Sequence, residues 1–419
     1  MKLMKKFTKL EWSWIFQDWA NSAYSLMITT AIFPIYYKSL TDAAGIASYD
    51  STAYLGYAKS ISTIFIALLA PFLGTSADFK GVRKPLFTIG TLVGIVSVLG
   101  MIFVKSDFWL LLLILYGFSA MGFSMANIFY DASIMDVTSY DRVDMVSSAG
   151  FGFGYIGSVI PFLIFMGLNF SGLLSSTITV YIGFILTAVW WFVFTIPYWK
   201  NVTQITYRQK TRSLIKESLE SLRTTFMDIQ QYPHIVMFLI AYFFYIDGVG
   251  TIIAMATAVG SDRGLSSQEL ILMLLLVQIV AFPFSMLYGY LSKKIGNKQM
   301  LYVGILTYIV ICVLGLGLKE FKDFLILAVL VGSAQGGIQA LSRSYFGQII
   351  PRDKSNQFFG FYNIFGKFSS ILGTTILAVV AQLTGDSLKG LFAIIVEFII
   401  GAILLSFVKP PQTSGQKQL

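Results

Sequence analysis

The stretch GTSADFKGVRK, Gly74–Lys84, is a short charged segment between two long apolar runs. The runs, residues 53–76 and 86–105, are each long enough to cross about 30 Å of hydrocarbon as a helix. The stretch therefore predicts two consecutive membrane spans joined by a charged loop, and the rest of the chain can be searched for the same pattern.

The composition supports a membrane protein. Apolar residues make up 56% of the 419 and charged residues 12%, with a mean hydropathy of +0.73, whereas soluble domains carry about 25% charged residues. The basic N-terminus is followed by an apolar run about twice as long as the core of a signal peptide, which indicates a retained first span. With Cys312 and His234 as the single cysteine and histidine, zinc binding and Cys/His catalysis are not expected.

Twelve apolar runs are long enough to span a bilayer. Helices are the only open-ended way to satisfy the backbone in lipid, and no run alternates with the two-residue period of a barrel strand. The expected fold class is therefore all-α. The expected spans are residues 12–39, 53–76, 86–105, 108–131, 146–168, 176–197, 233–259, 268–291, 299–317, 322–346, 357–382 and 388–408.

The loops predict the orientation and the domain organisation. Lys and Arg gather in the N-terminus, the even-to-odd loops and the C-terminus, which places both termini in the cytoplasm and explains the net charge of +9 without nucleic acid. The longest connection separates an N-terminal six-helix bundle, 1–197, from a C-terminal one, 233–419. Within the linker, 198–232, Ile215, Leu219 and Leu222 recur at helical spacing among charges. This amphipathic helix either lies along the cytoplasmic face or only spaces the bundles.

The two halves repeat one another. Gly74 and Gly81 in the first charged loop have the same spacing as Gly289 and Gly296 in GYLSKKIGNKQ. DWANS in span 1 corresponds to DGVGT in span 7, and DRVD after span 4 to PRDK after span 10. Transporters are often built from such repeats, with the substrate site between them, so we infer an internal duplication.

These features resemble the major facilitator superfamily, whose loop motif is matched by Gly74, Asp78, Gly81, Arg83 and Lys84. Phe79 stands where the motif expects a basic residue, and Lys80 follows it. The segments DWANSAY, DGVGTII, QALSRSYFGQIIP and FFGFYNIFGKF resemble the vacuole-effluxer-like permeases, related to a fungal autophagy protein that exports amino acids. The resemblance covers Trp12 to about Phe407 and implies two six-helix bundles, with spans 1, 4, 7 and 10 lining a central cavity.

Three glycines in span 5 form the pattern G-x-G-x-x-G, at Gly152, Gly154 and Gly157. No strand precedes them, as a dinucleotide-binding fingerprint would require. We therefore interpret them as small residues that allow close helix packing.

Polar residues inside the spans carry the functional prediction. A charge in a membrane helix is costly and normally faces a water-filled path or a partner, and Asp18, Asp131, Asp247 and Arg343 fall on the four cavity spans that the resemblance implies. Glu397 in span 12 is the exception, expected near a lipid-facing or contact surface. The candidates for solute or ion binding are Asp18, Asn21, Ser22, Asn127, Asp247, Thr251, Gln335, Gln339, Asn363 and Lys367.

Depth and the resemblance suggest specific pairings. Asp18 is expected to pair with Arg343 or to take up a proton, and Asp247 and Lys367 bracket the middle of the bilayer as an opposite-charge pair. In the facilitator fold Asp78 meets the start of span 11 near Ser355 and Asn356, and Arg83 pairs with Asp131 or Asp136. We expect an inner gate formed by Asp78, Arg83, Lys84, Asp131 and Arg343, although a positive-inside loop with helix caps would explain the charged loop alone.

The predicted function is secondary transport, by alternating access, of a small polar metabolite, with amino acids or related zwitterions favoured as substrate and efflux as direction. A facilitator of sugars or other metabolites, or a non-transporting sensor or lipid-handling protein, is the alternative. No phosphate-binding loop of the type G-x-x-x-x-G-K-[ST] is present, so direct ATP coupling is not expected. No nucleophile, base and orienting group cluster at one interface, so no enzyme activity is expected, and no cofactor is expected either. The expected partners are the solute, a coupling proton and the lipid bilayer of the cell membrane, and the expected state is a monomer.

Overall fold

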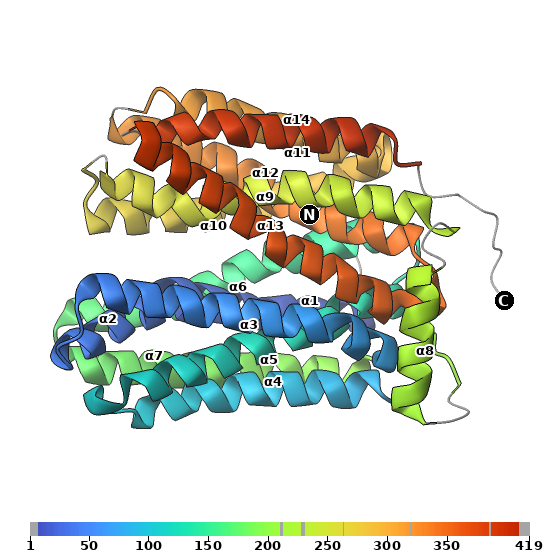
Figure 1. The fold of residues 1–419 in the computed structure, drawn as a ribbon, viewed down its shortest axis with the longest axis horizontal. Coiled ribbons are helices and arrows are strands. Elements are labelled where there is room, and N and C mark those ends of the chain that lie inside the picture. The colour runs from blue at the N-terminus through green and yellow to red at the C-terminus, as the bar shows by residue number, and fades with distance from the viewer. Residues whose placement is uncertain are drawn as a thin grey trace. The chain divides into compact units, whose positions relative to one another are not determined.

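The computed structural model describes residues 7–209, 213–227, 231–262, 264–318, 320–384 and 387–409. Within these residues the regular structure is helical, and strand-type pairing is limited to an isolated bridge between Phe79 and Arg208 (Figure 1). The predicted all-α class is confirmed.

The helices follow one another with short connections. The α-helices are α1 Lys9–Tyr24, α2 Phe33–Ala43, α3 Ser48–Ala77, α4 Arg83–Gly100, α5 Trp109–Val137, α6 Val143–Ser171, α7 Ser176–Asn201, α8 Leu214–Met227, α9 Pro233–Asp262, α10 Ser267–Ile295, α11 Asn297–Gly315, α12 Phe321–Ile349, α13 Ser355–Thr384 and α14 Leu391–Ser406. Shorter helical segments are η2 Ser25–Ile32, η3 Met101–Phe103, η4 Ser106–Phe108, η6 Arg352–Lys354 and η7 Ser387–Gly390.

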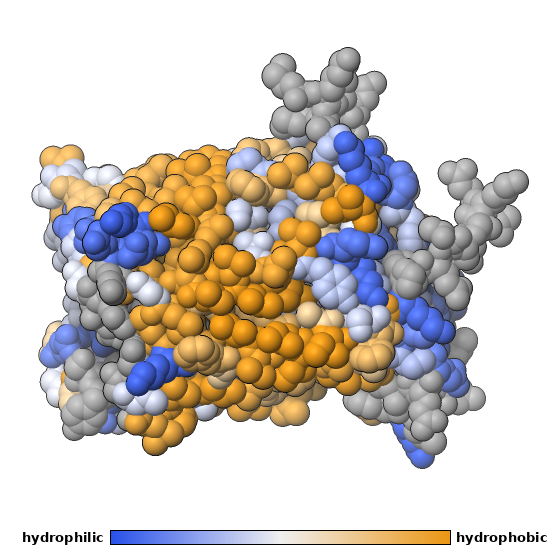
Figure 2. All heavy atoms as spheres, turned by 90° about the horizontal axis from the view of Figure 1, so that it is seen from above, coloured by the Kyte–Doolittle hydropathy of each residue, from blue (hydrophilic) through white to orange (hydrophobic). Residues whose placement is uncertain are grey.

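The helices match the twelve expected spans. In the described part of the chain, 10 helices are long and apolar enough to cross a membrane. The continuous run α1–η2–α2 and helix α13 correspond to the first and eleventh expected spans. Figure 2 shows one face of the molecule, where apolar residues cover the middle and hydrophilic residues gather toward both ends, as a lipid-exposed surface requires.

The first span widens at its centre. Segment η2 is π-helical, and the backbone N–H of Phe33 donates to the carbonyl of Ile28, five residues earlier. Pro34 explains this local change, because proline has no N–H and its ring crowds the carbonyl of Thr30, four residues before it. The widened segment directly follows, along the chain, the polar stretch that ends at Ser25.

Contacts divide the chain into two compact units. Unit 1 comprises residues 1–138, 150–219 and 356–361, and unit 2 comprises residues 139–149, 220–355 and 362–419. Helix α6 therefore begins in unit 2 and continues in unit 1. In α13, residues 356–361 belong to unit 1 and the rest of the helix belongs to unit 2. The bundle boundaries and the role of linker 198–232 stay predictions, although the linker does contain a helix, α8, with Ile215 and Leu219 exposed.

The glycines of α6 pack closely on α1 within unit 1. A Cβ atom on Gly154 would lie 2.4 Å from Ser22 Oγ, and one on Gly157 would lie 2.5 Å from the indole of Trp19. A larger residue would force the helices apart at either position. The close-packing interpretation is confirmed for Gly154 and Gly157, and for Gly152 it stays a prediction.

Candidate functional site

The charged loop of unit 1 turns a tight corner between α3 and α4. Gly74 lies against the backbone of Asn356, at the start of α13, where a Cβ atom would come within 2.4 Å of the Asn356 carbonyl oxygen. The chain then reverses at Gly81, whose φ of 79° favours glycine. The corner thus brings the end of α3 into direct backbone contact with α13.

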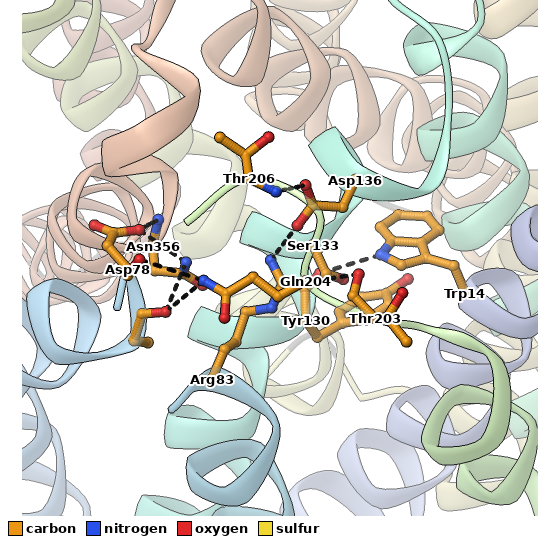
Figure 3. Close-up of polar contacts among 11 residues, drawn as sticks. Trp14, Asp78, Arg83, Tyr130, Ser133, Asp136, Thr203, Gln204, Thr206 and Asn356 are labelled. Carbon is orange, nitrogen blue, oxygen red and sulfur yellow. Dashed lines mark hydrogen bonds and ion pairs between the residues drawn. The ribbon is translucent and has the colours of Figure 1, made fainter. Parts of the chain in front are cut away.

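Asp78 caps the first turn of α13. Its Oδ1 accepts from the backbone N–H of Asn356 at 2.9 Å and from Nδ2 of the same residue at 2.8 Å (Figure 3). Its Oδ2 accepts from the backbone N–H of Gln357 at 3.0 Å. The first N–H groups of a helix have no partner within the helix and carry partial positive charge, so a carboxylate stabilises them. The contact expected between Asp78 and the start of span 11 is therefore present.

The Asp78 carboxyl is 2% exposed. Burial raises its pKa to about 7, although the amide donors of Asn356 and Gln357 and the charge of Arg83 act in the opposite direction. A carboxyl with this pKa changes its protonation state near neutral pH.

Arg83 forms a buried ion pair with Asp136. Its Nη1 lies 2.6 Å from Asp136 Oδ2, and Nη2 donates to the carbonyl of Thr203 at 3.3 Å. The sequence left Asp131 and Asp136 open as partners. Asp136 is at the last turn of α5, level with the corner, whereas half-buried Asp131 is five residues, roughly 7.5 Å, deeper along the helix.

The segment that follows α7, here called the strap, forms hydrogen bonds to this corner. In this strap, residues 202–209, Arg208 N–H donates to the carbonyl of Asp78 at 2.8 Å and Lys80 N–H donates back to Arg208 at 3.0 Å. Gln204 Nε2 reaches the carbonyl of Ala77 at 2.9 Å, and Thr206 N–H reaches Asp136 Oδ1 at 3.0 Å. These contacts could not be predicted from the sequence, because the segment has no apolar periodicity. Lys84, the remaining member of the loop motif, is exposed.

Unit 2 contains a corresponding corner between α10 and α11. Gly289 lies against the start of α6, where a Cβ atom would be 2.7 Å from Ser148 Cβ, and Gly296 turns the chain with a φ of 96°. Asp144 Oδ1 accepts from Asn297 Nδ2 at 2.7 Å and from Gln348 Nε2 at 3.0 Å. The matched glycine spacings predicted this second corner, but its acceptor, Asp144, was missed.

Arg343 belongs to the same region of unit 2. Its Nε donates to Ser147 Oγ at 3.0 Å and its Nη2 to the carbonyl of Ser147 at 3.1 Å. Ser147 Oγ in turn donates to the carbonyl of Ala340 at 2.7 Å. Asp18 is a buried residue of unit 1, and its pairing with Arg343 stays a prediction.

A polar cluster joins three spans inside unit 1. Asn21 Nδ2 donates to Asn127 Oδ1 at 2.6 Å, and Asn21 Oδ1 accepts from Gln17 Nε2 at 2.9 Å and from Trp191 Nε1 at 3.1 Å. Asn21 and Asn127 were sequence candidates, and Ser22 lies half-buried beside them. Gln17 was missed although it is one helical turn before Asn21. Trp191, in a span of aromatic residues, gave no signal.

Asp247 is enclosed within unit 2. Its Oδ1 accepts from the backbone N–H of Gly373 at 3.1 Å and from Thr251 Oγ1 at 3.4 Å, and its side chain lies close to that of Glu397. Lys367 precedes Gly373 on α13 by six residues, roughly 9 Å, and its pairing with Asp247 stays a prediction. Glu397 was expected near a lipid-facing or contact surface. It is 4% exposed and lies next to Asp247, so the contact alternative holds.

The other candidates of unit 2 are distributed along α12 and α13. Gln335 is buried and lines a cavity of about 130 Å³. Gln339, one turn later on α12, is half-buried, as are Asn363 and Lys367 on α13.

The fold is that of the major facilitator superfamily. The proton:xylose symporter XylE, bound to 6-bromo-6-deoxy-D-glucose, matches with a TM-score of 0.74 and 11% identity over 96% of each chain. A bacterial homologue of the iron transporter ferroportin, in its outward-facing state, matches with a TM-score of 0.71 and 12% identity over 96% of this chain and 99% of that chain. At these identities the likeness establishes the architecture alone.

The family follows from residues 8–418, which match the model described as vacuole effluxer Atg22 like, and the chain belongs to this family. The uncharacterized MFS-type transporter YxiO of Bacillus subtilis (strain 168) is 49% identical, covering 98% of this chain and 97% of that protein. Autophagy-related protein 22-2 of Aspergillus clavatus is 26% identical over 58% of this chain and 44% of its own length. The chain is thus a multi-pass membrane transporter of the major facilitator superfamily and not an enzyme, as the sequence predicted.

Proposed function

We propose that this transporter exports a small polar solute of the amino acid class by alternating access. The family description as vacuole effluxers supports the direction. The observation that supports the substrate class is the polar cluster of Gln17, Asn21 and Asn127, whose unused hydrogen-bonding groups complement a zwitterion.

The cluster offers one acceptor and one donor side. Gln17 Oε1 is buried and accepts no hydrogen bond within the described residues, and leaving a buried acceptor unsatisfied costs about 1 to 3 kcal/mol. Asn127 uses Oδ1 toward Asn21, which leaves its Nδ2 hydrogens for another acceptor. A bound solute with an ammonium and a carboxylate satisfies both groups, with the ammonium on Gln17 and the carboxylate on Asn127.

Transport assays in proteoliposomes test this function. We expect radiolabelled amino acids to be carried, with a rate that falls when Asn127→Ala or Gln17→Leu removes one side of the cluster. Gln268→Ala, at the exposed start of α10, is the control and keeps the wild-type rate. Carriage of sugars and no amino acid would reject the substrate class.

The Asp78 cap is proposed as part of the inner gate. In alternating access the start of α13 must leave this cap in one state, and the cap stabilises the state in which it is closed. We expect Asp78→Asn to change the transport rate while the protein still reaches the membrane in normal amount. An unchanged rate at normal expression would contradict the gate.

The cellular setting follows from the charge distribution. The Lys- and Arg-rich loops favour a cytoplasmic location for both termini in the cell membrane. We propose a monomer and coupling to a proton. Comparing solute accumulation in proteoliposomes with and without an imposed pH gradient tests the coupling, and accumulation independent of the gradient would oppose it.

A further inference from the structure

Two carboxyl groups face each other inside unit 2, on helices that the polar cluster does not involve. Asp247 on α9 is 0% exposed and Glu397 on α14 is 4% exposed, and their side chains lie close enough for each carboxyl to act on the other. Each lies in a helix apolar enough to span a membrane. A carboxylate in such a helix is costly, so two at one place call for a specific explanation.

Glycines at helix contacts bring the pair together. Gly248 lies against Phe398, where a Cβ atom would be 2.6 Å from the ring, so α9 and α14 pack closely beside the pair. Gly373 on α13 presents its backbone N–H to Asp247 Oδ1 at 3.1 Å. A Cβ atom on Gly373 would lie 2.3 Å from Thr251 Oγ1, so a larger residue would displace the donor. Three helices are thus shaped around these carboxyls.

Most of the carboxyl oxygens have no donor. Asp247 Oδ2 and both oxygens of Glu397 accept no hydrogen bond from another group in the described part of the chain. Two ionised carboxylates are both acceptors and repel each other, so holding them together in this buried place requires a proton on one of them. The geometry therefore fits a pair that shares one proton.

The surroundings offer no charge that would stabilise the ionised forms. Among the described residues, the titratable groups that act on the pair are the two carboxyls themselves and the neighbouring thiol of Cys312 from α11, and no Lys or Arg is among them. Cys312 also lines the cavity of about 130 Å³, whose other walls are apolar except at Gln335. Losing the shared proton would leave two negative charges in a low-dielectric interior.

We propose that Asp247 and Glu397 form a protonation site that holds one proton, and that this proton is the one coupled to transport. The second statement rests on the proposed function, whereas the first concerns the protein without any solute. Release of the proton gives two repelling carboxylates, which favours separation of α9 from α14, and uptake restores their contact. The site thus links proton occupancy to the packing of two spans.

Infrared difference spectroscopy of the purified protein in nanodiscs tests the protonation site directly. All spectra are taken on an Asp78→Asn background, which removes the other carboxyl that titrates near neutral pH. On this background we expect the otherwise wild-type protein to lose a carboxylic-acid carbonyl band between neutral and alkaline pH. Glu397→Gln and Asp247→Asn should each shift or abolish this band, and the double variant should lack it. Glu320→Gln is the matched control, because Glu320 is exposed, and should leave the band unchanged. A band that persists in the double variant, or no band in the otherwise wild-type protein, would overturn the site.

The sole cysteine provides a second readout. The S–H stretch of Cys312 should shift with pH in the wild type, because Glu397 is close enough to act on the thiol. This dependence should disappear in Glu397→Gln and remain in Glu320→Gln. A shift retained in Glu397→Gln would mean that another group titrates there.

The coupling is tested separately. In proteoliposomes, Glu397→Gln should retain exchange of internal for external solute but lose stimulation by a pH gradient. Stimulation retained in this variant would reject the coupling role, while the infrared result would still decide the protonation site. If no amino acid is carried at all, the proposed substrate class fails and the infrared result again stands alone.

Discussion

The two corners, one in each unit, share a backbone design and differ in their chemistry. Gly74 and Gly289 allow close helix contact, and Gly81 and Gly296 turn the chain with positive φ. In unit 1 the carboxylate is on the corner, at Asp78, and the start of α13 donates to it. In unit 2 the carboxylate moves to the start of α6, as Asp144, and the corner donates through Asn297.

The difference concerns what kind of donor the carboxylate meets. Asp78 is held by two backbone N–H groups and one side-chain amide. A backbone N–H group can only donate a hydrogen bond. Asp144 is held by the side chains of Asn297 and Gln348, whose amides can rotate to present either a donor or an acceptor. The corner of unit 1 therefore requires two acceptor oxygens at one position, whereas that of unit 2 tolerates an amide.

The largest expected contrast is between Arg83 and Lys298, which occupy the same place in the two corners. Arg83→Gln leaves Asp136 buried without its ion-pair partner and should cost about 3 to 5 kcal/mol. Lys298 is half-buried and donates to the carbonyls of Ser406 and Val408 after α14, so Lys298→Gln should cost about 0.3 to 1 kcal/mol. Thermal unfolding in detergent measures both, and equal losses would contradict the comparison.

The next contrast is between the two packing glycines. Gly74→Ala places a methyl group 2.4 Å from a backbone oxygen, and such overpacking costs about 1 to 3 kcal/mol. Gly289→Ala meets the side chain of Ser148 at 2.7 Å, so adding Ser148→Gly should restore most of its stability. Failure of this double variant to recover would show that the backbone, not the serine side chain, limits the corner of unit 2.

Neutralising the acid should cost more stability in the corner of unit 1 than in the corner of unit 2. Asp78→Asn turns an amide toward backbone N–H groups and should cost about 1 to 3 kcal/mol at pH 6. Asp144→Asn should cost less, because Asn297 and Gln348 can rotate their amides to suit the new residue. Melting temperatures of the two variants decide this, and a greater loss for Asp144→Asn would reverse the interpretation.

A smaller effect is expected from pH. The pKa of Asp78 rises from its ordinary 3.8 to about 7 in the folded protein, so the folded state binds the proton more tightly than the unfolded state. Its contribution to stability is greatest below about pH 4, falls as pH rises to about 7 and is constant above that. The melting temperature of the wild type relative to Asp78→Asn should therefore decrease between pH 5.5 and 8. A difference that grows with pH would mean that the amide donors outweigh burial.

The sequence predicted what depends on depth and spacing along one helix. Apolar run lengths gave the spans, the paired glycine spacings gave both corners, and the motif gave Asp78 at the start of α13. Contacts that depend on how each helix is rotated about its own axis were harder to predict from the sequence. Helix α14 is apolar around its whole circumference, so no amphipathic pattern shows which way Glu397 points. The strap over the Asp78 corner depends on backbone hydrogen bonds from a segment without regular structure, which no residue pattern encodes.

The central claim is that Asp78 holds the first turn of α13 through backbone amides. Hydrogen exchange measured by mass spectrometry on peptides covering residues 352–361 tests it without any solute, with Asp144→Asn as the matched control. We predict that exchange at Asn356 and Gln357 is faster in Asp78→Asn than in the wild type and unchanged in Asp144→Asn. Identical exchange in the wild type and Asp78→Asn would contradict the claim.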